Sequence, residues 1–333
     1  MVTCEHSVTG ETSNTELSGD HPLVSVVIPT YNYAAYVGQA IESVLMQDYE
    51  PKQIIVADDE STDNTAEILA AYKDRVEVLH LVHGGPGAAR NAGLHAATGE
   101  LIALLDADDL WLAGKLSQQV KVMRQTPQAG LSHSLIEPFD ENGIYEPWVP
   151  DKDELAHGNC AEKIFRVNSI ATSTVIMRRE AIPQHGFYED MPTSQDYALW
   201  LDVLFGYPAV FIPQVLARYR GHPGQVTSNM RKRWPIYQGL ARLRILDQQP
   251  DQIDSANRQT LRSWALDRLH QSAYDRYWRG DYKWAAIGFS FLRRYGREIP
   301  ARHRLLAAIR RWLPKQGPSQ ANEGNAMGSR TPQ

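Results

Sequence analysis

Two spacings of hydrophobic residues alternate along residues 21–125. Short β-branched runs predict buried strands, and stretches with apolar residues three and four positions apart predict amphipathic helices between them. Strands that alternate with helices in this way favour a parallel sheet with helices on both faces. The expected strands are Leu23–Ile28, Gln53–Ala57, Val76–Leu81 and Leu101–Leu105, and the expected helices are Val37–Leu45, Ala66–Tyr72, Ala88–Ala97 and one ending near Gln125.

The pattern is less regular after residue 125 and then becomes helical. Leu131–Phe139 and Ile144–Trp148 flank Asp-Glu-Asn-Gly, which predicts a hairpin. Ser173–Met177 predicts a further strand, Asp196–Phe205 a helix, and Ala209–Ile212 and Val215–Tyr219 two short edge strands. Beyond Arg231 the apolar spacing predicts helices over Pro235–Gln248, Ser255–Trp278, Tyr282–Arg294 and His303–Trp312.

The charge balance changes where the helical region begins. Residues 1–230 carry 14 Lys/Arg against 31 Asp/Glu, whereas residues 231–313 carry 18 against 7. We therefore expect a catalytic domain over 21–230 and a basic helical region over 231–313. The polar segments 1–20 and 314–333 are expected to be disordered tails. The basic region either meets an anionic partner or complements the acidic domain.

Cysteine content and hydropathy exclude several protein classes. Cys4 and Cys160 are the two cysteines of the 333-residue chain, and they form neither a disulfide framework nor a metal-binding spacing. This usage fits a reducing cytoplasm. No run approaches the roughly 18 apolar residues of a spanning helix, and the polar first twenty residues do not read as a signal peptide. The expected location is cytoplasmic, with peripheral contact at the inner face of the plasma membrane left open.

Three carboxylates follow the fourth expected strand. They are Asp106, Asp108 and Asp109, interrupted by Ala107. Open α/β sheets bind ligands at the carboxyl ends of their strands, and period-2 geometry puts Asp106 and Asp108 on one side if the strand continues. Neighbouring carboxylates repel unless a cation joins them, and Mg²⁺ or Mn²⁺ suits such oxygen ligands. The alternative is an acidic turn that caps the next helix.

Other strand ends carry polar groups as well, and the whole constellation resembles the inverting glycosyltransferases of family 2. These include Thr30-Tyr31-Asn32, Asp58-Asp59 and Gly87–Arg90. The resemblance implies a GT-A fold, with a mixed, mostly parallel sheet and the helical region C-terminal to it. Met230 replaces the Gln of the Gln-x-x-Arg-Trp motif of polysaccharide synthases, which favours the non-processive bacterial type. The matching segments, within Leu23–Asn229, are VSVVIPTYN, VADDESTDNT, GAARNAGLHAATGELIALLDADD, SQDYALWL and YRGHPGQVTS.

The resemblance implies a nucleotide-sugar site along these strand ends. The segment from Pro29 to Tyr31 would pack on the base, and Asp58 or Asp59 would accept a hydrogen bond from a base imide. Arg90 would meet phosphate or base, aided by the positive end of a helix. The implied nucleotide-sugar residues are Pro29, Thr30, Tyr31, Asp58, Asp59, Arg90, Asp106, Ala107 and Arg220.

The resemblance also implies a metal site and a general base. Asp108 would bind Mn²⁺ or Mg²⁺ on the donor diphosphate, and His222 would ligate the metal or donate to phosphate. Asp196 would take the proton of the acceptor hydroxyl as that oxygen attacks the anomeric carbon. Two positions depart from the family pattern. Gln195 stands where the family has Glu, and Glu60 stands where it usually has Gly.

Each of these residues also has a purely structural interpretation. Asp58-Asp59 would be a turn, Arg90 a surface ion pair, and Asp196 a helix N-cap. His222 would be a loop histidine without a partner, and Tyr31 a core residue.

Two other functions stay open for the whole protein. One is a nucleotide-sugar-binding protein without catalysis. The other is a metal-dependent phosphohydrolase, although such enzymes place Asp-x-Asp after the first strand. The resemblance implies a nucleotide-sugar donor, most often a UDP-sugar, and a glycan or lipid-linked acceptor, with no nucleic-acid partner. The basic helices near Arg302 and Arg310 would rest on an anionic inner leaflet or pack on the first domain.

Overall fold

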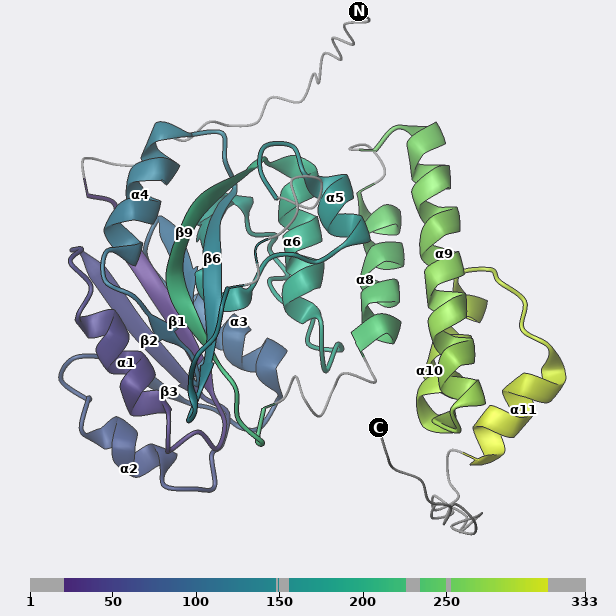
Figure 1. Ribbon diagram of the computed structural model, residues 1–333, viewed down its shortest axis with the longest axis horizontal. Coiled ribbons are helices and arrows are strands. Elements are labelled where there is room, and N and C mark those ends of the chain that lie inside the picture. The colour runs from purple at the N-terminus through teal and green to yellow at the C-terminus, as the bar shows by residue number, and fades with distance from the viewer. Residues whose placement is uncertain (1–20, 148, 150–155, 226–233, 250–252, 311–333) are drawn as a thin grey trace, which may run out of the picture. The chain divides into compact units, whose positions relative to one another are not determined.

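The computed structural model describes residues 21–147, 149, 156–225, 234–249 and 253–310 (Figure 1). The tails expected at 1–20 and 314–333 lie outside these residues. The chain divides into two compact units inside one helix, between Leu269 and His270. This division falls later in the chain than residue 231, where the charge balance changes.

The first unit is built on one mixed sheet with the strand order β3-β2-β1-β4-β8-β6-β9-β5, and β7 pairs with β6. Pairing shows that β1, β2, β3, β4, β6 and β9 run in one direction, whereas β8 and β5 run against their neighbours. We call the edge where those six strands end the carboxyl edge. The strands are β1 Val24–Thr30, β2 Lys52–Asp58, β3 Glu77–His80, β4 Leu101–Leu104, β5 Leu110–Trp111, β6 Leu131–Asp140, β7 Gly143–Ile144, β8 Ile176–Arg178 and β9 Ala209–Arg220.

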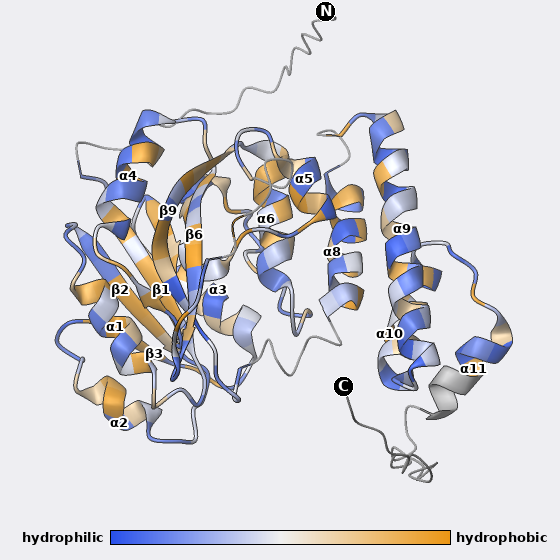
Figure 2. Cartoon of the chain, in the orientation of Figure 1, coloured by the Kyte–Doolittle hydropathy of each residue, from blue (hydrophilic) through white to orange (hydrophobic). Residues whose placement is uncertain are grey.

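Helices cover both faces of this sheet, as the alternating pattern predicts (Figure 1). Helices α1 (Val37–Leu45) and α4 (Lys115–Gln125) bury their apolar positions in one core with Val24, Val26 and Ile28 of β1. Helix α3 (Pro86–Ala96) packs on the opposite face, where Gly93 lies so close to Val27 that a Cβ would clash with it. Figure 2 shows the strands as mainly hydrophobic and the outward helix faces as hydrophilic.

The remaining elements of the first unit are short helices and the helices that follow the sheet. They include two 3₁₀ turns, η1 (Thr172–Thr174) and η2 (Arg179–Ala181). The α-helices are α2 Thr65–Ala70, α5 Ala161–Arg166, α6 Gln195–Gly206, α8 Trp234–Gln248 and the first part of α9 (Ser255–Trp278).

The second unit consists of the end of α9 with α10 (Tyr282–Arg294) and α11 (Ala301–Arg310). Gly280, with φ +75°, makes the turn between α9 and α10. The Tyr274 ring packs against Phe289 and His303, with centroid distances of 5.0 and 5.3 Å. Within the part of the chain that is described, no helix is both long enough and apolar enough to cross a bilayer.

Two sequence expectations about strands are wrong, and a condition set for the acidic segment is not met. The two edge strands expected over 209–212 and 215–219 are one strand, β9, which has a neighbour on each side. A register shift opposite Ser134 and Leu135 absorbs the exposed Pro213 and Gln214. The strand expected over 173–177 begins only at Ile176, because η1 precedes it. The acids do not continue β4, which ends at Leu104.

Candidate active site

The acidic segment after β4 is a tight turn at the carboxyl edge. The Asp109 N–H donates to the Asp106 carbonyl at 3.0 Å, so the turn, rather than strand period, sets the direction of the carboxylates. Asp106 and Asp108 stay partly exposed, whereas Ala107 and Asp109 are buried. The Ala107 side chain belongs to the hydrophobic core. A donor contact of Ala107 would therefore use its backbone.

Asp108 and His222 form a pair with the chemistry of a metal site. His222 Nε2 lies 3.0 Å from Asp108 Oδ2, and the rings of Tyr33 and Tyr36 lie 5.8 and 4.7 Å from the His222 ring. The two atoms are within hydrogen-bond distance of each other, and both are atom types that ligate divalent ions. An imidazole nitrogen beside a carboxylate favours Mn²⁺ over Mg²⁺.

The protein supplies few ligands for such an ion. Among the described residues, no group of three or more His, Cys, Asp or Glu side chains is arranged to hold a metal. Divalent ions in phosphate-transfer sites commonly take one or two protein ligands and fill the rest with substrate oxygens and water. The pair therefore fits an ion that arrives with a diphosphate.

Burial and like charges oppose ionisation of these acids. Burial and the neighbouring Asp106 raise the pKa of Asp108, while the hydrogen bond from His222 works against this rise. Burial, together with Asp108, also raises the pKa of the Tyr33 hydroxyl. A cation at this position would relieve the repulsion between the two carboxylates.

Arg90 is a buried partner of the acids and not a surface ion pair. It lies inside α3, its residue is 8% exposed, and Nη2 is 2.7 Å from Asp106 Oδ1. Burial disfavours the guanidinium charge, but Asp106 and Asp196 outweigh it and raise the pKa of Arg90. Arg90 is thus a fixed positive charge beside both acids. Its contact with phosphate or base stays a prediction.

Arg220 ends β9 and ties that strand to the acidic turn. Its backbone N–H donates to Asp109 Oδ1 at 3.0 Å, and its Nε donates to the Asp108 carbonyl at 2.8 Å. Its guanidinium also lies over the rings of Tyr36 and Phe139, at 4.9 and 4.4 Å. Burial lowers the pKa of Arg220, although Asp108 partly counters this.

Asp196 lies in the first turn of α6 and is not the N-cap. The cap position is Ser194, and Asp196 Oδ1 accepts from the Tyr197 N–H at 2.7 Å. The other oxygen, Oδ2, accepts from the Thr172 hydroxyl at 3.1 Å. Burial raises the pKa of Asp196, against the opposing charge of Arg90. A carboxylate with a raised pKa is a stronger base than an ordinary one.

The ends of β1 and β2 form the side of the site expected to bind the nucleotide. Pro29 is half-buried and Thr30 buried, while Tyr31 is 41% exposed and is therefore not a core residue. The Tyr31 ring lies 4.6 Å from the His83 ring. An exposed aromatic face at this position suits a planar base.

The Asp58-Asp59 pair holds neighbouring loops. Asp58 Oδ1 accepts from the Ser61 N–H at 3.1 Å. Asp59 accepts from the N–H groups of Gly84 and Gly85 at 2.8 and 2.9 Å. Both acids are buried, so they do more than form a surface turn. His83 Nδ1 also lies 2.9 Å from Asp59 Oδ2, so Oδ1 is the Asp59 oxygen that keeps a second lone pair for a ligand.

Glu60 extends this arrangement by one residue. Its Oε2 accepts from the His83 N–H at 3.1 Å, so Asp59 and Glu60 together hold three consecutive amides. Glu60 has φ +64°, a left-handed conformation that suits glycine better than glutamate. Glutamate in place of the family's usual glycine therefore adds a hydrogen bond to the neighbouring loop, but it strains the backbone at residue 60.

The structure brings five of the predicted site residues into one connected group. Direct contacts join Arg90 to Asp106, and Asp108 to both Arg220 and His222, and the acidic turn links the two sets. Among the described residues, the Asp59 side chain contacts the 83–85 loop and not this group. Tyr33 bridges the two sides, since it follows β1 and hydrogen-bonds Asp108. Sequence reasoning missed Tyr33, Tyr36, Thr172 and Ser173, whose importance depends on contacts between distant segments.

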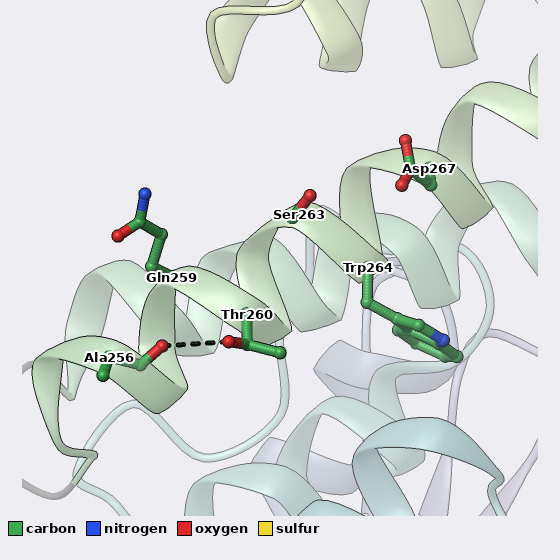
Figure 3. A pocket seen from close by; sticks show the side chains of 6 residues that line it. All are labelled: Ala256, Gln259, Thr260, Ser263, Trp264 and Asp267. Atoms are coloured by element: carbon green, nitrogen blue, oxygen red, sulfur yellow. Dashed lines mark hydrogen bonds between the residues drawn. The ribbon is translucent and has the colours of Figure 1, made fainter.

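A shallow cavity of about 580 Å³ lies outside this group. Ala256, Gln259, Thr260, Ser263, Trp264 and Asp267 line it, all on α9 (Figure 3). The Thr260 hydroxyl donates to the Ala256 carbonyl within the helix. The cavity contains none of the acids or arginines described above, and it carries no functional argument.

Comparison with known proteins identifies the class. A model of glycosyl transferase family 2 matches residues 25–185. The putative teichuronic acid biosynthesis glycosyltransferase TuaG of Bacillus subtilis is 31% identical over 235 residues, covering 68% of this chain and 91% of TuaG. This chain belongs to glycosyl transferase family 2, and it is a glycosyltransferase.

Other relatives of this chain include an enzyme whose name specifies its reaction and a longer, uncharacterised protein. WfaP of Escherichia coli, a UDP-Glc:α-D-GlcNAc-diphosphoundecaprenol β-1,3-glucosyltransferase, is 34% identical over 217 residues, 63% of this chain and 82% of WfaP. An uncharacterised glycosyltransferase of Rickettsia bellii is 34% identical over 182 residues, 54% of this chain. The chain matches only 26% of that longer relative.

Solved structures agree on the fold. Staphylococcus aureus TarS 1–349 in complex with UDP-GlcNAc aligns over 86% of this chain and 87% of its own, with a TM-score of 0.64 and 20% identity. This likeness confirms the expected GT-A fold with its mixed, mostly parallel sheet.

Proposed function

We propose that this chain is an inverting, metal-dependent glycosyltransferase that moves a sugar from a UDP-sugar to a hydroxyl of a glycan or lipid-linked acceptor. The donor proposal is supported by WfaP, whose name specifies UDP-Glc, and by the UDP-GlcNAc complex of TarS. The acceptor proposal is supported by WfaP and WfgD of Escherichia coli, whose names specify a diphosphoundecaprenol-linked sugar.

One observation carries the proposal. The Asp108–His222 pair and the Asp196 carboxylate belong to one chain of contacts at the carboxyl edge. The first suits an ion on a diphosphate, and the second suits a base. An ion and a base at opposite ends of one connected group suit a displacement in which one side holds the leaving group and the other activates the nucleophile.

The residues of the chain have distinct tasks in this displacement. Asp196 accepts the proton of the acceptor hydroxyl while the acceptor oxygen bonds to the anomeric carbon and the bond from that carbon to the diphosphate breaks. The single displacement inverts the anomeric configuration. Arg90 holds Asp106 in place, and Arg220 holds the Asp108 backbone. Asp108 and His222 would hold a divalent ion, which would supply positive charge opposite the departing diphosphate.

A panel of nucleotide sugars tests the proposal. We expect a UDP-sugar to release UDP when Mn²⁺ and an acceptor are present, and EDTA to stop the release. GDP-sugars serve as the comparison. NMR of the product is expected to show a β linkage from an α-linked donor. UDP binding by calorimetry without turnover of any donor would instead favour a binding protein, and retention of configuration would exclude the single displacement.

We also propose that the second unit contacts an anionic membrane surface, where a lipid-linked acceptor would lie. Residues 270–305 carry eight Lys/Arg against three Asp/Glu. Trp278 is 73% exposed and Leu305 is 62% exposed on the same unit. Exposed aromatic and aliphatic side chains among basic residues suit the interface of anionic lipid, because they add apolar contact to charge attraction.

Vesicle sedimentation tests this contact. We expect the protein to sediment with phosphatidylglycerol vesicles more than with phosphatidylcholine vesicles, and to be released by high salt. Trp278→Ala should weaken binding several-fold. The matched control is Trp234→Ala, which removes a 38% exposed tryptophan from the first unit. Equal binding to both lipids, or an equal loss in both variants, would count against the proposal.

A further inference from the structure

The 3₁₀ turn η1 reaches two parts of the site through consecutive side chains. The Thr172 hydroxyl donates to Asp196 Oδ2 at 3.1 Å. The Ser173 hydroxyl donates to Asp109 Oδ2 at 2.6 Å and accepts from the Asp106 N–H at 3.1 Å. One rigid turn therefore contacts both the base and the acidic turn.

We propose, on the basis of the function proposed above, that Thr172 and Ser173 are positioning residues that hold the general base and the metal-binding turn at a fixed separation. Neither residue is expected to touch the reacting atoms. Each acts through the carboxylate that it binds. Thr172 orients Asp196, and Ser173 orients the turn that carries Asp108.

Ser173 controls the acidic turn through a chain of contacts. Asp109, which accepts from the Ser173 hydroxyl, also accepts from the Arg220 N–H. The Arg220 side chain in turn holds the Asp108 carbonyl. The Ser173 carbonyl accepts from Trp111 Nε1 at 2.8 Å, just beyond the turn. Ser173 thus contacts residues at the start, within and after the acidic segment.

Thr172 determines how the base is presented. Asp196 Oδ1 is bound by the Tyr197 N–H, so the Thr172 hydroxyl fixes the remaining rotation of the carboxylate. A hydrogen bond to the charged form favours that form, and Thr172 accordingly lowers the pKa of Asp196 against the effect of burial. Loss of the hydroxyl should therefore change both the orientation and the titration of the base.

The turn itself is well anchored. Thr172, Ser173 and Thr174 are all buried. The Leu104 N–H at the end of β4 donates to the Val175 carbonyl at 3.2 Å, and Gln119 Nε2 donates to the Thr174 carbonyl at 3.0 Å. β4 also leads directly into the acidic turn. The end of β4 therefore fixes the positions of both η1 and the acidic turn.

Two conservative variants separate the two roles. Thr172→Val keeps the shape of the side chain and removes its donor. We expect kcat to fall about 10-fold or more, with unchanged affinity for UDP–Mn²⁺ and an acid limb of the pH profile moved to higher pH. Ser173→Ala should instead weaken UDP–Mn²⁺ binding about 10-fold in calorimetry and leave the acid limb where it is.

The matched control is Thr174→Val. Thr174 is a buried residue of the same turn whose hydroxyl donates to the Ala171 carbonyl and contacts none of the acids. If all three variants lose activity alike and share one pH profile, the turn is merely structural and the inference is wrong. If the wild type binds UDP–Mn²⁺ but transfers no sugar, the proposed function fails. The calorimetric contrast between Ser173→Ala and Thr172→Val then still decides the role of Ser173.

Discussion

Asp196→Asn is expected to reduce sugar transfer by about 10²–10⁴-fold, because an amide cannot accept the proton of the acceptor hydroxyl. Donor affinity should change little, since Asp196 belongs to the acceptor side of the proposed mechanism. In the wild type, kcat should rise as pH increases through the pKa of Asp196, which burial places above the usual aspartate range. The measurements are kcat as a function of pH and UDP affinity by calorimetry.

The control for this variant lies on the same helix. Asp202→Asn changes a buried carboxylate of α6 that has no contact with the acids of the site, and burial raises the pKa of Asp202 to about 7. Because the folded protein holds the proton of Asp202 more tightly than the unfolded chain, its contribution to stability falls as pH rises toward 7. Asp202→Asn should therefore keep its fold and activity at pH 8. Equal losses in both variants would show damage to α6 instead of loss of a base.

Asp108→Asn is expected to remove the benefit of Mn²⁺ for donor binding and to lower kcat/KM by about 10²–10³-fold. An amide oxygen is a weaker ligand than a carboxylate, and the variant also loses the charge that faces His222. Calorimetric titration of UDP with and without Mn²⁺ measures the effect directly.

Asp48→Asn is the matched control for the metal side. Asp48 is an exposed carboxylate whose described partner is the Ser117 hydroxyl, at 3.1 Å. This variant should keep the full Mn²⁺ dependence of the wild type. The metal assignment would be wrong if Asp108→Asn bound UDP as tightly as the wild type and still responded to Mn²⁺.

The regular part of the fold could be predicted from local pattern alone. The first four strands and the helices between them follow from hydrophobic period, and their bounds agree with the structure to within a few residues. Period is informative here because β1, β2 and β4 are largely buried on both faces and each helix is buried on one.

The later strands could not be placed in this way. Pro213 and Gln214 interrupt the apolar pattern of β9, and only the register shift against β6 keeps the strand continuous. Similarly, the polar residues of η1 read as the start of a strand. Their true conformation depends on the acids that they bind in other parts of the chain.

In the candidate site too, some residues could be predicted from local sequence and others only from contacts between distant segments. Asp106 and Asp108 could be predicted because acids at a strand end have chemical meaning in sequence, whereas Asp196 was implied only by the resemblance to the family. Thr172 and Ser173 have ordinary hydroxyls, and only their contacts reveal a role. In sequence, Asp109 looks equivalent to Asp106 and Asp108. In the structure it is buried, and it accepts hydrogen bonds from Ser173 of η1 and Arg220 of β9.

Glu60 has a strained backbone conformation, but its side chain holds a neighbouring loop through the His83 N–H. Its left-handed conformation costs on the order of 1 kcal/mol relative to glycine. Exchange for glycine would recover that energy while freeing the His83 amide, and with it the ring that lies on Tyr31. Glutamate at this position therefore accepts a backbone cost and holds the His83 ring against Tyr31, on the surface proposed to bind the nucleotide.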